Sequence, residues 1–406
     1  YSITGLSCNN FHLYHLNNDT NFVSLCQIII FKTVFVAKID KSFYLRLNKN
    51  NKIVKLYKQE LVIMFNKQQL AFCTFAAKSL LKQLNRLVKQ VEGAKIAKDP
   101  ECIHQMRVAS RHLRSSLPIF KECFPQNHKK WRKEIKKITK ELGTARDLDV
   151  QIIFLEDFIK KMNQHQDTRG ISRLILRQKQ ARQKQQKKVN KAIDIFQSSG
   201  IVDEITQISR QIIGQSKLKK LPSRYVINLP AIVDLINTHL ADILSYEDFI
   251  YDPGSDIQLH NLRKACKRLR YTLELFEPLY QSKLKDPIKK MKHFQTLLGD
   301  IHDCDVWRDF LPVFLENEKE RTIQYFGHKR PFSRIRRGVE FLRHNREDYR
   351  KQKYQEFINE WEKAKQENFW TQLETIFSSE KAVISDVTQI EKKAGKQLHK
   401  IKQRET

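Results

Sequence analysis

A segment of this chain occurs twice, 156 residues apart, and this internal repeat limits the folds open to the sequence. Residues 104–120 align with residues 260–276, and both segments begin with the pattern His-x-x-Arg. Without any gap, residues 142–155 then align with residues 298–311, each beginning with Leu-Gly. Self-similarity at a fixed offset predicts two copies of one structural unit.

Each copy has the pattern of long α-helices. Apolar residues recur at intervals of three and four, and the chain has only 11 Gly and 10 Pro among 406 residues, which favours helices over many-turned β structure. Asp99 is expected to cap a helix that has Pro100 in its first turn. We expect helices over residues 68–93, 100–122, 128–142, 147–162, 170–197, 201–216, 229–246, 257–278, 286–298, 304–319, 335–378 with a break, and 380–403. Gly143 and Gly299 are predicted to end helices in the left-handed conformation.

The charge of the chain indicates an anionic partner. Lys and Arg number 75 against 45 Asp and Glu, a formal net charge of +30, which attracts polyanions. No two glycines lie within ten residues of each other, which excludes the glycine-rich phosphate loops of nucleotide-binding proteins.

The cysteines and the most apolar window exclude other classes. The seven cysteines form no Cys-x-x-Cys pair, so we expect no zinc site, no disulfide scaffold and a reducing compartment. Cys266 and Cys304 are expected to be small core residues. Lys32 and Lys38 interrupt the apolar window 22–39, which predicts that it does not cross a membrane.

The first 63 residues differ from the rest. They contain no Met, the first one being Met64, and only the segment 42–47 alternates weakly, as a strand would. We expect residues 1–63 to be a leader that is disordered or not translated.

Cations of each copy share one helix face. At 100° per residue, four residues of the first copy fall within about 80°; this first stripe is His104, Arg107, Arg111 and Arg114. The equivalent second stripe is His260, Arg263, Lys264, Lys267, Arg270 and Tyr271. The following helices add further cations, namely Lys133, Lys136, Lys137, Lys140, Lys289, Lys292 and His293. Arg146 and His302 are expected just after the two glycines. Such stripes repel each other unless an anion lies between them, although cations can also simply solvate outer helix faces.

The acidic residues beside them are expected to be structural. Asp147 and Asp303 are predicted to cap a helix or to pair with an arginine rather than to act in catalysis. The segment 302–305 reads His-Asp-Cys-Asp, but the first copy has Arg146 in place of His302. We therefore expect no metal site.

The doubled patterns, HxxRVxxRxLR with LGxxRDxDV and HxxRKxxKRLRY with LGxxHDxDV, resemble the conserved histidine α-helical domain, the CHAD family. The resemblance covers residues 66–406. It implies an all-α fold of two pseudo-twofold-related four-helix bundles of long antiparallel helices, here residues 64–228 and 229–406, around a basic central cavity that binds inorganic polyphosphate. The resemblance carries this role to ten residues, namely His104, Arg107, Arg111, Arg114 and Arg146 of the first copy and His260, Arg263, Lys267, Arg270 and His302 of the second. Many family members also have a triphosphate-hydrolysing domain, but residues 1–63 lack its ExExK strand.

We therefore expect a non-catalytic, cofactor-free module that binds polyphosphate or other polyanions in the cytoplasm, on polyphosphate granules and not on membranes. Two alternatives remain open. An RNA- or DNA-binding helical protein has the same electrostatic basis, although the stripes hold few aromatic residues. A metal-dependent phosphohydrolase would use His302 and Asp303.

Overall fold

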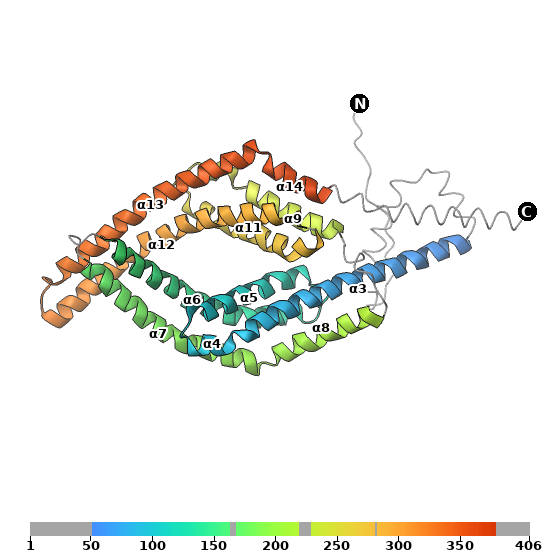
Figure 1. The fold of residues 1–406 in the computed structure, drawn as a ribbon, viewed down its shortest axis with the longest axis horizontal. Helices are drawn as coiled ribbons and strands as arrows, with labels where there is room; N and C mark the ends of the chain where they lie inside the picture. The colour runs from blue at the N-terminus through green and yellow to red at the C-terminus, as the bar shows by residue number, and fades with distance from the viewer. Residues whose placement is uncertain (1–50, 163–167, 219–228, 281, 379–406) are drawn as a thin grey trace, which may run out of the picture. The chain divides into compact units, whose positions relative to one another are not determined.

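The chain has an all-α fold, shown in a computed structural model (Figure 1). The structure describes residues 51–162, 168–218, 229–280 and 282–378. These residues form α-helices and one 3-10 turn, with no strand among them. The chain divides into two units, Tyr1–Asn66 and Lys67–Thr406, and the second contains every feature discussed below. Residues 1–50 of the expected leader 1–63 lie outside the described residues. The same holds for the expected strand 42–47, the expected final helix 380–403 and the expected boundary between the bundles at residue 228.

The helices follow one another with short connections. Their bounds are α3 Asn51–Lys89, α4 Val91–Ile96, α5 Pro100–Ile119, α6 His128–Lys161, α7 Arg169–Ser198, α8 Ile201–Leu218, α9 Leu229–Leu244, α10 Glu247–Ile250, α11 Asp256–Phe276, η2 Glu277–Leu279, α12 Lys285–Phe326, α13 Phe332–Gln366 and α14 Phe369–Ser378. The sequence predicts the first of these from residue 68, but α3 already begins at Asn51, so residues 51–63 are helical here.

Local chemistry explains several helix ends. The Asp99 carboxylate accepts a hydrogen bond from the Glu101 backbone N–H at 2.8 Å, and Pro100 occupies the first turn of α5, which confirms the predicted start. The break predicted within 335–378 is also confirmed. It lies between α13 and α14, where Asn368 has a φ of 51°, a left-handed conformation that ends helices.

The predicted stops at Gly143 and Gly299 are wrong. Both glycines lie inside continuous helices, α6 and α12, and the described glycines with positive φ are Gly200 and Gly327. A Cβ on Gly143 would lie 3.6 Å from Arg107 Nε, and one on Gly299 would lie 3.5 Å from Arg263 Nε. Alanine would therefore fit at either position in ordinary contact with an arginine of a stripe, and each glycine costs its helix about 1 kcal/mol relative to alanine.

The helices pack in the same order in both halves: α5 on α6 and α6 on α7, then α11 on α12 and α12 on α13. A large apolar core includes buried residues from α5, α6, α11 and α12. A smaller core joins the far ends of α6 and α12 to the first turns of α7 and α13. At the crossing of α7 and α13, a Cβ on Gly170 would lie 3.1 Å from Gly338 Cα. These two glycines therefore let the two helices approach closely.

One pair of cysteines corrects the sequence analysis. Cys73 on α3 and Cys123, which follows α5, form a disulfide with their Cα atoms 5.1 Å apart. They are 50 residues apart in sequence, so no motif indicates the pairing. Packing of Phe72 and Phe75 of α3 against Phe120 brings them together. Cys266 and Cys304 are free and buried, as expected.

Within the described part of the chain, none of the helices has the length and apolarity that a membrane span requires. The apolar window 22–39 lies outside that part.

Candidate anion-binding site

The first stripe lies on the side of α5 opposite the core. Met106, Ala109, Leu113 and Leu117 are fully buried, so the 3.6-residue period turns the cations of the stripe away from these apolar residues. His104, Arg107, Arg111 and Arg114 are all partly buried. The predicted amphipathic pattern of α5 is therefore what positions them.

Tyr271 of α11 connects the two stripes. The Arg111 guanidinium lies 5.5 Å from the centre of its ring, and the Arg270 guanidinium lies 4.9 Å from it. A cation near a tyrosine ring is attracted by the negative face of the ring. Cations from α5 and α11 thus approach the same aromatic side chain, and the predicted stripes lie next to each other in space.

Positive charge is crowded where the stripes meet. Burial, followed by the charges of Arg111, Arg263 and Arg107, lowers the pKa of Lys267 to about 7. Burial also lowers the pKa of Arg111, which Tyr271 opposes, while Arg107, Arg114 and Arg263 add to the lowering. These interactions run between α5 and α11. A bound anion would relieve the repulsion, because it stabilises each protonated form.

Both stripes keep equivalent nitrogen atoms without a hydrogen-bond partner. Nε of Arg107 and of Arg263 is buried and unpaired, and so is Nδ1 of His104 and of His260. Arg107 pairs through Nη2 with Asp147, whose Oδ1 lies 3.4 Å away. A buried donor without a partner costs about 1–3 kcal/mol. The same unpaired atoms recur at equivalent positions in both copies, so both stripes have groups open to an external partner.

Arg146 and His302 adjoin the leading histidines of the stripes. The His260 and His302 rings have their centres 4.2 Å apart. Burial lowers the pKa of His302 to about 4, and Arg263 and His260 contribute. In the first copy, burial and then Arg146 lower the pKa of His104. Unliganded, these histidines are therefore neutral near pH 7, whereas we expect a bound anion to raise their pKa.

The comparison with known proteins assigns the family. The family model described as "CHAD domain" matches residues 78–312, which is more than half of the chain. The chain belongs to the CHAD domain family. The matched range includes both stripes and both glycines that adjoin their arginines.

A solved structure is similar to this CHAD chain. It is described as "Crystal structure of the CHAD domain from the plant Ricinus communis", with 22% sequence identity and a TM-score of 0.49, covering 68% of this chain and 85% of that chain. No curated protein matches this sequence.

The lysines that follow the first CHAD stripe divide into two groups. Lys133 and Lys136 are exposed on α6. Lys137 instead pairs with Glu134 at 2.7 Å, and together with Lys140 it lines a groove of about 390 Å³ between α6 and α7. Lys137 is about 120° around α6 from Gly143 at 100° per residue. The structure therefore places Lys137 and Lys140 beside the stripe rather than within it.

The second CHAD copy divides in the same way. Lys292 adjoins α11, where it lowers the pKa of Glu274 against the larger effect of burial. His293, equivalent to Lys137, lies 3.6 Å from Glu360 of α13 and so faces away from α11. Lys289 and Lys264 are exposed, and Lys264 donates to Asn261 at 3.1 Å.

Three titratable groups near the stripes are absent from the sequence prediction. The His112 ring lies 4.8 Å from Tyr271, and burial, followed by Arg270, lowers its pKa to about 4. Glu274 lies 3.9 Å from His112 Nε2 and 3.6 Å from Arg270 Nε. Arg132 of α6 contributes to the lowered pKa of Arg114, after burial. The position of Glu274 four residues after Arg270 is a detectable signal, because such residues are neighbours on a helix.

The acidic residues of the motifs have structural surroundings. Asp147 pairs with Arg107, as the sequence predicts, but both it and Asp303 lie inside helices and therefore cap none. Although Asp303 is exposed over much of its surface, the protein atoms crowded around its carboxylate raise its pKa to about 6, against the effect of Arg263. The described residues include no cluster of three or more His, Cys, Asp or Glu that suits a metal ion.

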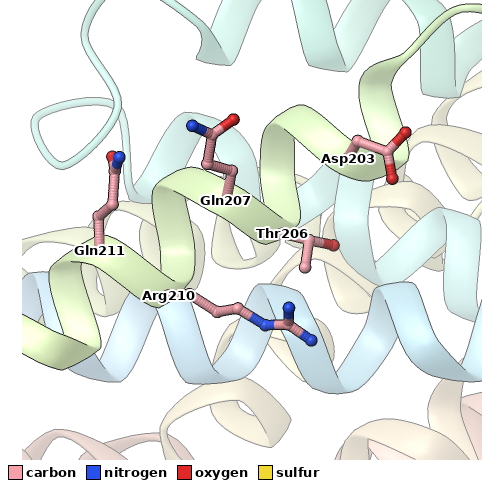
Figure 2. A pocket seen from close by; sticks show the side chains of 5 residues that line it. All are labelled: Asp203, Thr206, Gln207, Arg210 and Gln211. Carbon is pink, nitrogen blue, oxygen red and sulfur yellow. The ribbon is translucent and has the colours of Figure 1, made fainter.

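A pocket on α8, unlike the region of the stripes, has no excess of positive charge. It measures about 500 Å³ and is lined by Asp203, Thr206, Gln207, Arg210 and Gln211. Figure 2 shows that Gln207 and Gln211 point away from Arg210. With one carboxylate and one guanidinium, this pocket has no excess charge that would select an anion.

Proposed function

We propose that this CHAD domain binds inorganic polyphosphate at the two stripes and holds it without catalysis. The observation that carries the proposal is the unpaired, buried Nε of Arg107 and Arg263, each beside a glycine and within a group of further cations. Guanidinium groups suit phosphate oxygens because they can donate two parallel hydrogen bonds. A polymer with about one charge per phosphate would place many acceptors along both stripes.

The composition of the stripes supports this polymer over a base-containing one. Tyr271 is the aromatic residue in them, and Arg111 and Arg270 already adjoin its ring. Binding of polyphosphate requires only cations, whereas proteins that bind single-stranded nucleic acids also stack the bases on aromatic side chains. The proposed role is storage or targeting in the cytoplasm, on polyphosphate granules.

Binding of polyphosphate to the variant Arg107→Gln/Arg263→Gln tests the site. We expect the affinity to fall at least tenfold, and the slope of log affinity against log salt to become shallower, because fewer counterions are released. The matched control is Lys160→Gln/Lys351→Gln, whose side chains are 74% and 80% exposed. Equal losses in the two variants would show that only total charge matters and would remove the site.

Absence of catalysis is tested separately. We expect no release of orthophosphate from polyphosphate with Mg²⁺ or Mn²⁺, by the wild-type chain or by Asp303→Asn. Release that depends on Asp303 would replace the binding function with hydrolysis.

A further inference from the structure

A second basic surface lies on α7 and α12, apart from the stripes. It is a groove of about 960 Å³ lined by arginines of both helices and by aromatic residues of α12. The residues used below are Arg173, Arg177, Arg321, Tyr325 and Phe326. We call it the α7–α12 groove.

The arginines of the groove are held in place by one buried carboxylate. Glu318 is 1% exposed and accepts hydrogen bonds from Arg177 and Arg321, both at 2.6 Å. Arg173 Nε lies 3.8 Å from it. Burial alone would raise the pKa of Glu318, but the bonds from the two arginines outweigh burial and lower it. Three guanidinium groups thus share one negative charge, and the positive excess remains for a ligand.

The aromatic side of the groove is open. Tyr325 is 82% exposed and Phe326 is 51% exposed, with their ring centres 4.7 Å apart. Exposure of two adjacent aromatic rings to water is unfavourable, and exposed apolar patches commonly mark a binding surface. The two rings pack edge to face, with an angle of 77° between their planes, and the exposed surface of each remains open to a planar ligand, whereas Tyr271 already contacts Arg111 and Arg270.

The chain beyond these rings is strongly basic. From Gly327 to Val339 it has five Lys or Arg and no Asp or Glu. Lys329 and Arg330 are exposed in the turn between α12 and α13. Positive charge therefore continues past the groove on the side of the exposed rings.

We propose that the α7–α12 groove and this turn bind single-stranded nucleic acid. Bases stack on Tyr325 and Phe326, and phosphates pair with the arginines and with Lys329 and Arg330. Stacking rings beside a basic track are the usual features of sequence-tolerant single-strand binding. An acidic peptide would also match the charge, but two adjacent exposed rings favour a ligand with its own planar groups. This site is independent of polyphosphate binding at the stripes.

Fluorescence anisotropy of a labelled twelve-nucleotide uridine RNA tests the proposal on the full chain. We expect Tyr325→Ala/Phe326→Ala to weaken RNA binding about tenfold or more and to leave polyphosphate affinity within twofold. Lys329→Gln/Arg330→Gln should weaken RNA binding and flatten its salt dependence. The charge-matched variant Arg107→Gln/Arg263→Gln should retain RNA binding, whether or not it loses polyphosphate. Thermal unfolding of each variant shows that it is folded.

Several outcomes would overturn the assignment. RNA affinity unchanged by both groove variants, or lost in Arg107→Gln/Arg263→Gln alone, would place RNA elsewhere. Tighter binding of a labelled peptide of alternating Asp and Phe, lost in the groove variants, would identify an acidic protein partner instead. Failure of polyphosphate to bind would remove the proposed function of the stripes but would not affect this result.

Discussion

The two stripes use different cations at equivalent positions. The first contains Arg111 and adjoins Arg146, and these guanidinium groups stay charged at any physiological pH. The second contains Lys267 and adjoins His302, with pKa values of about 7 and about 4. Both pairs of residues lie near the contact of α5 with α11. The difference in the pH dependence of their charge therefore comes from the side chains and not from the fold. The first stripe offers a permanent charge, and the second offers one that depends on pH and on the ligand.

The largest expected effect is the loss of polyphosphate affinity on removing the permanent charge of Arg111, compared with removing the pH-dependent charge of Lys267. Arg111→Gln should weaken polyphosphate binding about 10- to 100-fold, since hydrogen bonds to charged groups contribute about 1.5–3 kcal/mol. Lys267→Gln should cost clearly less at pH 8, where much of the free Lys267 is neutral, and about as much at pH 6. Titration calorimetry at both pH values measures this. Equal losses at pH 8 would mean that the stripes are equivalent.

The pH dependence of binding should come from the second stripe. A bound anion raises the pKa of Lys267 and His302, so binding takes up protons and affinity falls as pH rises. Lys267 contributes above about pH 7 and His302 contributes from about pH 4 upwards, until each pKa of the bound state is passed. We expect a several-fold fall between pH 6 and pH 8.5. Lys267→Arg should remove the upper part of this dependence; an unchanged profile would exclude Lys267 as its source.

Stability without ligand should show the opposite trend. The folded pKa of Lys267 is about 7 and its ordinary value is 10.5, so the unfolded chain binds more protons between these values. The free energy of unfolding therefore rises with pH from about 7 to 10. Midpoints of urea unfolding at pH 7 and pH 9 measure the change, and Lys267→Met should reduce it. A midpoint that falls with pH equally in both proteins would contradict the assignment.

The smallest expected effect concerns the two glycines. Gly143→Ala and Gly299→Ala should each raise the free energy of unfolding by about 0.5–1 kcal/mol, because alanine favours helices. The added Cβ would meet its arginine at an ordinary contact distance, so binding should change little. Leucine at either position should weaken binding by displacing the guanidinium. A loss of stability with alanine would show that the room beside the arginines is smaller than the structure indicates.

Sequence alone predicts most of the helices, apart from the false breaks at Gly143 and Gly299, and it places the cations of each stripe on one helix face. Helix period places Arg107, Arg111 and Arg114 on one face, and the repeat places Arg263 and Lys267 on the equivalent one. Both predictions need only local geometry. The structure brings the two faces together at Tyr271, which the repeat alone does not predict.

Features that depend on contacts between helices were missed or misassigned. Gly143 was given the role of a helix stop because the sequence does not show that Arg107 lies against it. The Cys73–Cys123 pairing depends on the packing of α3, and the direction of Lys137 and His293 depends on α7 and α13. His112 lies outside the arc of the stripe, although its ring contacts Tyr271. These features depend on tertiary contacts, which a helical wheel of one helix does not show.

Helix α12 is continuous and therefore fixes the distance between the second stripe and the α7–α12 groove. His302, at the second stripe, and Phe326, at the α7–α12 groove, are on the same helix, and the 24 residues between them correspond to about 36 Å at 1.5 Å per residue. Because the helix is continuous, this distance between the two sites is fixed. A short polymer can occupy either place but cannot reach both, whereas a chain longer than this distance could bridge them on one molecule.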